Sequence, residues 1–145
     1  MGKINFKSFI DVRIRFSDMD SLGHVNNAVY LSYFEEARVH YFRELLDLPS
    51  IGSTSPGMIV LETHCTYKTP AYYGETLRIY SKVSWMKNKS FEMRYAAIEI
   101  ESGRTVAEGS SILVAYDYQT GQTVPIPESV RSRISAFENI SSSLA

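Results

Sequence analysis

Residues 26–46 read Asn26-Asn-Ala-Val-Tyr-Leu-Ser-Tyr-Phe-Glu-Glu-Ala-Arg-Val-His-Tyr-Phe-Arg-Glu-Leu-Leu46. The apolar residues of this stretch recur at spacings of three and four, which is the period of an amphipathic helix. These residues are Val29, Tyr33, Phe34, Ala37, Tyr41, Phe42, Leu45 and Leu46. The sequence therefore predicts one long helix, with Asn26 or Asn27 as its N-terminal cap.

Strand-like segments lie on both sides of this helix. Residues 10–16 alternate strictly between apolar and polar, so Ile10, Val12, Ile14 and Phe16 are expected on one face of a half-buried strand. After the helix come four further strand-like runs, and a short helix is expected from about Glu128 to Phe137. The four runs cover about 59–67, 77–85, 90–101 and 105–116.

The connections between these four runs are of hairpin length, so successive strands are expected to be antiparallel neighbours. A helix this long cannot be covered by a two-stranded ribbon. The order of elements therefore predicts an α+β fold in which a broad antiparallel sheet curls around the helix.

Composition excludes several classes of protein. The chain has 145 residues, of which 44% are hydrophobic and 12% aromatic, which indicates one folded domain. Its net charge of −1 argues against a nucleic-acid binder, and its one cysteine cannot form an internal disulfide. No metal-ligand spacing and no membrane-spanning run is present, and the N-terminus lacks a signal-peptide core. We expect no metal, no cofactor and a cytoplasmic location.

The connection before the long helix contains the strongest candidates for catalytic residues. Asp18 and Asp20 lie just before a helix N-terminus, where unpaired backbone N–H groups can polarise a carbonyl oxygen. A carboxylate there can attack that carbonyl or activate a water. The alternative is that both Asp residues only form turns or caps. His24 acts either as a general base or as a hydrogen-bonding residue that fixes the loop.

Residues 78–94 contain five basic residues and one acidic residue, Glu92. The tip of this segment, Lys87 to Ser90, has donors suited to a phosphate, and the alternative is an ordinary solvated sheet face. Elsewhere, Cys65 is expected to be a small buried hydrophobe. Tyr30, Tyr33 and Phe34 are expected in the core or an interface.

The stretch Phe16-Ser-Asp-Met-Asp-Ser-Leu-Gly-His-Val-Asn-Asn-Ala-Val-Tyr-Leu-Ser-Tyr-Phe-Glu-Glu-Ala-Arg38 resembles the signature of hotdog-fold acyl-CoA thioesterases, most closely the 4-hydroxybenzoyl-CoA thioesterase type. Residues 67–77 resemble a second recurrent stretch of that family. The resemblance spans roughly residues 9–137. It implies a hotdog fold, in which a curved antiparallel sheet wraps around one long central helix.

The resemblance also implies roles for individual residues. Asp20 matches the catalytic carboxylate, and Asp18 is its loop-shaping neighbour. The backbone N–H of Asn27 matches the group that polarises the thioester carbonyl, with Asn26 or Ala28 as alternatives. Gly23 and His24 shape the loop, and His24 can orient Asp20 or the substrate.

Coenzyme A (CoA) phosphates are expected on Lys87, Lys89 and Ser90. The family places its active sites between subunits, so a homodimer or homotetramer is expected. The domain is expected to cover 1–137, with a frayed tail over 138–145.

These features together predict an acyl-CoA thioesterase in which Asp20 is the nucleophile or the general base. Two alternatives remain open. One is a non-catalytic module that binds acyl-CoA or an acyl-carrier protein, and the other is an acyl-carrier-protein thioesterase.

Overall fold

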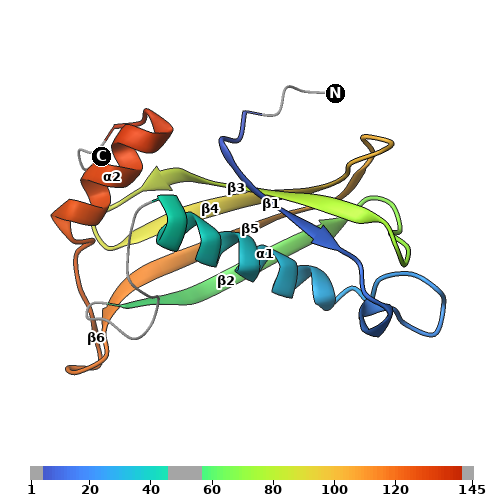
Figure 1. The fold of residues 1–145 in the computed structure, drawn as a ribbon. Helices are drawn as coiled ribbons and strands as arrows, with labels where there is room; N and C mark the ends of the chain where they lie inside the picture. The colour runs from blue at the N-terminus through green and yellow to red at the C-terminus, as the bar shows by residue number, and fades with distance from the viewer. Residues whose placement is uncertain (1–4, 46–56, 142–145) are drawn as a thin grey trace.

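One antiparallel sheet curls around helix α1 (Val29–His40), as Figure 1 shows. The strands follow the order β1-β3-β4-β5-β2 across the sheet, and β6 pairs with β5. A second helix, α2 (Glu128–Glu138), covers one end. The structure is a computed structural model and describes residues 5–45 and 57–141. The strand bounds are β1 Ser8–Arg13, β2 Gly57–Tyr67, β3 Thr76–Met86, β4 Ser90–Glu99, β5 Thr105–Asp117 and β6 Gln122–Thr123.

The predicted α+β fold is confirmed, but the predicted position of β2 is wrong. β2 pairs with β5 at one edge of the sheet, whereas β3 lies between β1 and β4. The connection over residues 68–75 therefore crosses the ends of β5 and β4 instead of forming a hairpin. Such a connection can span about 26 Å when extended, whereas three strand spacings amount to only about 14 Å. A short connection is thus compatible with a crossover, and its length alone does not distinguish the two.

Helix α1 begins at Val29, three residues after the predicted start at about Asn26, and changes its winding near the end. The Ala28 N–H donates to Asn26 Oδ1 at 2.9 Å in the turn before the helix. The N-cap residue is Ala28, without a side-chain cap hydrogen bond, so the predicted cap at Asn26 or Asn27 is wrong. The α-helix ends at His40 and continues as a π-helical turn over Tyr41–Leu45. The last predicted helical residue, Leu46, lies outside the described residues.

The core lies between α1 and the concave face of the sheet. Phe34 stacks on Tyr95 of β4, with ring centroids 4.8 Å apart, and lies against Gly109 of β5. Strand β1 ends at Arg13 and a 3₁₀ turn begins at Phe16, so the alternation does not extend as far as predicted. The expected core position of Phe16 is therefore wrong, since its side chain is 79% exposed.

Helix α2 ends at Glu138, one residue after the predicted end at Phe137. Glu138 belongs to α2, and its Oε2 accepts hydrogen bonds from the Tyr41 hydroxyl at 2.7 Å and the Val83 N–H at 3.0 Å. Asn139 ends the helix with a positive φ of 57°. Residues 142–145 of the predicted tail lie outside the described residues.

Candidate active site

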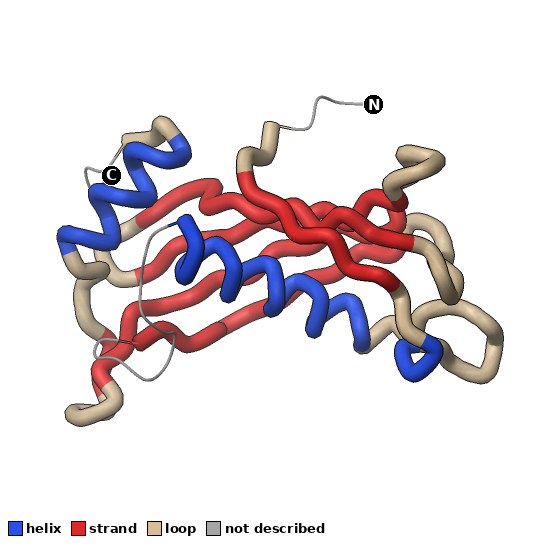
Figure 2. Tube along the Cα trace, viewed as in Figure 1, coloured by secondary structure: helices blue, strands red, loops and turns tan. Residues whose placement is uncertain are grey.

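The loop between β1 and α1 is closed by its own backbone. The Asp20 N–H donates to His24 O at 2.9 Å, and the Gly23 N–H donates to Asp20 O at 3.3 Å. Gly23 has a φ of +87°, which favours glycine because other residues meet a steric penalty there. In Figure 2 this loop lies at the end of the sheet opposite α2.

Asp20 both shapes this loop and presents a carboxylate. Its Oδ1 accepts hydrogen bonds from the N–H groups of Leu22 at 2.8 Å and His24 at 3.4 Å. Its Oδ2 lies 3.6 Å from His24 Nδ1, and the side chain is 25% exposed. The turn-forming interpretation therefore accounts for one oxygen, and the second oxygen remains within reach of solvent and of His24.

Asp18 lies two residues away but has a different environment. It is buried, and its Oδ2 accepts hydrogen bonds from the Tyr33 hydroxyl at 2.8 Å and the Arg15 N–H at 3.0 Å. The Arg15 guanidinium lies 3.0 Å from Oδ1. Burial by itself raises the pKa of Asp18, but hydrogen bonds from Arg15 and Tyr33 outweigh it, so the pKa lies below its usual range. Asp18 is thus an ionised anchor that ties the loop to α1.

The backbone N–H groups at the helix start differ in whether a described residue accepts their hydrogen bonds. The Asn26 N–H donates to Asp18 O at 3.0 Å, and the Ala28 N–H is taken by Asn26 Oδ1. Among the residues that the structure describes, none accepts a hydrogen bond from the Asn27 N–H. Of the three N–H groups suggested by the resemblance, Asn27 is therefore the one left available to an oxygen of a ligand.

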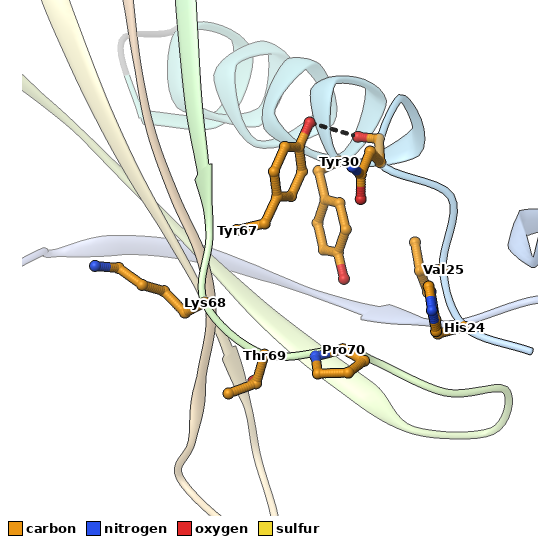
Figure 3. Close-up of a pocket in the computed structure, with 8 residues that line it drawn as sticks. His24, Val25, Tyr30, Tyr67, Lys68, Thr69 and Pro70 are labelled. Atoms are coloured by element: carbon orange, nitrogen blue, oxygen red, sulfur yellow. Dashed lines mark hydrogen bonds between the residues drawn. The ribbon is translucent and has the colours of Figure 1, made fainter. Parts of the chain in front are cut away.

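A pocket of about 210 Å³ opens beside this helix start (Figure 3). It is bordered by the loop, the first turn of α1, the end of β2 and the start of the 68–75 connection. The lining residues are His24, Val25, Asn27, Tyr30, Tyr67, Lys68, Thr69 and Pro70. Asp20 is not among them, but His24 links its carboxylate to the pocket.

Six of these lining positions were not predicted as site residues: Val25, Tyr30, Tyr67, Lys68, Thr69 and Pro70. The last four lie in the second stretch that carried the resemblance, so that stretch was the available signal. Tyr30 was expected in the core or an interface, and its ring is indeed buried. Periodicity could not show that it also borders a pocket.

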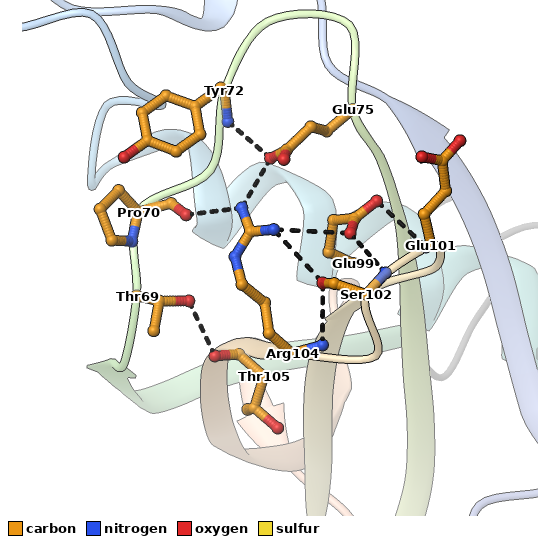
Figure 4. A network of polar contacts seen from close by, with 9 residues as sticks. All are labelled: Thr69, Pro70, Tyr72, Glu75, Glu99, Glu101, Ser102, Arg104 and Thr105. Carbon is orange, nitrogen blue, oxygen red and sulfur yellow. Dashed lines mark hydrogen bonds and ion pairs between the residues drawn. The ribbon is translucent and has the colours of Figure 1, made fainter.

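The 68–75 connection is held in place by Arg104 (Figure 4). The Arg104 guanidinium donates to Pro70 O at 3.0 Å and Glu75 Oε1 at 2.8 Å, and it lies 3.4 Å from Glu99. Next to Pro70, the Ala71 carbonyl accepts a hydrogen bond from the Val25 N–H at 2.9 Å. This network therefore fixes the connection against the loop that carries Asp20.

The predicted CoA-binding residues do not join this group within one chain. Lys87, Lys89 and Ser90 form the hairpin between β3 and β4, beside α2. The pairing of β1 with β3 places Thr76 opposite Arg13, near the loop, so the hairpin lies at the far end of β3. With a rise of roughly 3.3 Å per residue, the length of β3 separates the two regions by about 35 Å.

Other residue types add little to the site. Cys65 was predicted to be a small buried hydrophobe, but it is only partly buried. Burial nevertheless raises the pKa of its thiol, which disfavours the reactive thiolate. Across residues 5–45 and 57–141, no group of three or more His, Cys, Asp or Glu side chains could hold a metal ion. No helix in the same ranges is long and apolar enough to cross a membrane.

Solved structures identify the fold. A thioesterase from Thermus thermophilus, complexed with coenzyme A and zinc, has a TM-score of 0.84 at 31% identity, covering 96% of this chain and 99% of its own. A thioesterase-superfamily protein from Jannaschia sp. CCS1 has a TM-score of 0.85 at 27% identity, covering 95% and 87%. The sheet and its enclosed helix are a hotdog fold, as the resemblance implied.

Residues 14–134 match the sequence profile of the Thioesterase-like superfamily. YsmA of Bacillus subtilis is 32% identical over 122 residues, which is 84% of this chain and 81% of YsmA. The long-chain acyl-CoA thioesterase FadM of Escherichia coli is 24% identical over 123 residues, 85% of this chain and 93% of FadM. The chain belongs to the Thioesterase-like superfamily and is related to acyl-CoA thioesterases.

Proposed function

We propose that this protein is an acyl-CoA thioesterase, which hydrolyses a coenzyme A thioester to a free acid and coenzyme A. The observation that carries the proposal is that His24 links the Asp20 carboxylate to a pocket lined by Asn27, whose N–H has no acceptor among the described residues. The coenzyme A bound to the related Thermus structure and the activity in the name of FadM support CoA as the carrier.

The thioester carbonyl oxygen accepts a hydrogen bond from the Asn27 N–H at the positive end of the helix dipole. This interaction withdraws electrons from the carbonyl carbon. Asp20 then either attacks that carbon to form a mixed anhydride, which water hydrolyses, or removes a proton from a water that attacks directly. In both routes the C–S bond breaks, one water is consumed, its oxygen enters the acid, and the thiol leaves with a proton.

A second copy of the chain completes the site in this proposal. The outer edge of β2 carries exposed apolar side chains, including Val60 at 41% and Leu61 at 58% exposed. Exposed edges of this kind favour pairing with another strand. A two-fold axis at β2 reverses the partner's sheet direction and brings the partner's β3–β4 hairpin to the end that carries Asp20. In such a dimer, the distance between the Asp20 loop and the β3–β4 hairpin of the same chain does not prevent Lys87, Lys89 and Ser90 from binding the phosphates.

Thiol release from a panel of short, long and aromatic acyl-CoAs tests the activity. We expect hydrolysis of at least one ester, with the same acyl group on an acyl-carrier protein turned over more slowly. Faster turnover of the carrier-protein ester would identify an acyl-carrier-protein thioesterase. Tight binding of acyl-CoA without thiol release would identify a non-catalytic binding module.

A further inference from the structure

Tyr30 occupies an unusual position at the candidate site. It lies in the first turn of α1, and the residue is only 3% exposed. Its ring contacts those of Tyr33 and Tyr67, with centroids 5.9 Å and 5.6 Å away. In Figure 3 the hydroxyl end of Tyr30 extends between the segment at Val25 and the segment at Pro70. The ring is thus part of the core, while its polar end borders the pocket.

The other hydroxyl groups of the pocket already have partners. The Tyr67 hydroxyl donates to Asn27 O at 3.0 Å, and the Thr69 hydroxyl donates to Thr105 O at 3.0 Å. Within residues 5–45 and 57–141, the Tyr30 hydroxyl has no hydrogen-bond partner. The Tyr30 hydroxyl is not among the fully buried polar atoms that lack a partner, so the pocket leaves it accessible. A tyrosine hydroxyl usually has a partner when the rest of the residue is buried, and a ligand atom that enters the pocket can accept its hydrogen bond.

The geometry of the helix brings this hydroxyl toward the unused backbone donor. Side chains of an α-helix lean toward its N-terminus, so Tyr30 reaches back over the turn that begins at Asn27, three residues earlier. The backbone N–H groups of that turn point in the same direction. Asn27 and Tyr30 line the same pocket, so one ligand bound there can contact both donors.

We infer that the Tyr30 hydroxyl donates a second hydrogen bond to the carbonyl oxygen of the thioester, alongside the Asn27 N–H. This inference rests on the proposed thioesterase function and adds a residue to it. The bond strengthens as negative charge develops on that oxygen in the transition state. The proton stays on Tyr30 throughout, so the residue is a donor and not an acid that transfers its proton.

The environment of Tyr30 suits a neutral donor. Burial raises its pKa to about 12, so the phenol keeps its proton across the range in which thioesterases are assayed. The hydroxyl belongs to a residue that is only 3% exposed, and Val25 and Pro70 line the same pocket. A hydrogen bond in such surroundings is stronger than one in water.

Tyr30→Phe tests the inference, because it removes the hydroxyl and keeps the ring contacts. We expect kcat to fall by roughly 100-fold, the size found for the loss of one oxyanion donor, with KM changed by no more than about 3-fold. The variant should bind a non-hydrolysable acyl-CoA, in which methylene replaces the thioester sulfur, as tightly as the wild type. Tyr95→Phe is the matched control, since it removes a buried hydroxyl that contacts Arg38 away from the pocket.

An unchanged kcat in Tyr30→Phe would overturn the inference, and so would a rise in KM alone. If the wild type hydrolyses no thioester, the proposed function fails first and the inference fails with it. If Tyr30→Phe does not fold, tetrafluorotyrosine at position 30 replaces it, since it keeps the shape of the side chain and lowers its pKa. Activity should then be lost at a lower alkaline pH than in the wild type, and an unmoved pH profile would contradict the inference.

Discussion

Asp18 and Asp20 show how two identical side chains, two residues apart, come to differ in chemistry. Asp18 is buried among donors from Arg15 and Tyr33, so its negative charge is balanced and its oxygens are occupied. Asp20 accepts hydrogen bonds from its own loop through one oxygen and keeps the other near His24. Only Asp20 therefore has an oxygen available to a substrate or a water.

The lowered pKa of Asp18 makes the fold sensitive to acid. Because the folded-state pKa lies below the unfolded value of about 3.9, this stabilisation is present above that pH and is lost as pH falls through the folded pKa. We expect Asp18→Asn to lower the free energy of unfolding at pH 7 by about 1–3 kcal/mol and to weaken its dependence on pH below about 4. Urea unfolding measured from about pH 2 to pH 8, a range that includes the unfolded-state pKa of about 3.9, tests both effects. An equal loss at every pH would contradict this role.

The contact between α1 and β5 depends on the absence of a side chain at Gly109. A Cβ there would lie 2.5 Å from Phe34 Cε2 and 2.9 Å from the backbone oxygen of His64. Phe34 cannot retreat easily, because its other face stacks on Tyr95.

We therefore expect Gly109→Ala to lower the free energy of unfolding by about 1–3 kcal/mol, as overpacking in cores does. Ser110→Ala, one residue along the same strand, should change it by less than about 0.5 kcal/mol. Chemical denaturation measures the stability of both variants. Equal stability of the two would show that α1 does not pack closely enough on β5 to exclude a methyl group at position 109.

One guanidinium binds two points of the 68–75 connection. Arg104 contacts Pro70 O, Glu75 and Glu99 at once, and the planar fork of arginine suits this arrangement better than the ammonium of lysine. We expect Arg104→Lys to lower the free energy of unfolding by about 1–2 kcal/mol and to raise the hydrogen-exchange rate of the Val25 N–H, which donates to Ala71 O. Exchange measured by mass spectrometry should show this loosening at Val25, and unchanged protection there would rule out the clamp.

Local sequence patterns identified the elements better than their arrangement. The period of the 26–46 stretch found helix α1, and alternation or strand-like runs found every described strand except the short β6. The pairing of β2 with β5 was missed because the chain between β2 and β3 has the length of either a hairpin or a crossover. The contacts of Arg104 join positions about thirty residues apart in sequence, and no local pattern records them.

At the level of the whole molecule, the pocket is made from two distant segments, 24–30 and 67–70, that the fold brings together. From the residues alone, Asp20 and His24 could be predicted as candidate catalytic residues. Asn27 came from the resemblance, and the side of the pocket formed by residues 67–70 came from the three-dimensional structure. Tyr30 could not be recognised earlier, because periodicity separates buried from exposed positions and does not show where a hydroxyl points.

The proposed partner at β2 makes assembly testable by itself. We expect the wild type to sediment as a dimer or tetramer, and Leu61→Glu to shift it toward the monomer by placing a charge at the β2 edge. Ile100→Glu is the matched control, since Ile100 is also exposed, at 45%, but lies in the β4–β5 turn. A monomeric wild type at concentrations where it is active would contradict the shared site.

The most direct test of the account is thiol release by Asp20→Asn beside the wild type, on an acyl-CoA that the wild type hydrolyses. The change keeps the shape of the side chain and removes the charge that attacks the carbonyl or activates water. We expect kcat to fall by about 100- to 10,000-fold, with thermal stability close to that of the wild type. Asp11 is a surface carboxylate paired with Arg78 across β1 and β3, so the control variant Asp11→Asn should keep wild-type activity. Substantial thiol release by a folded Asp20→Asn would contradict the role of this carboxylate and the mechanism built on it.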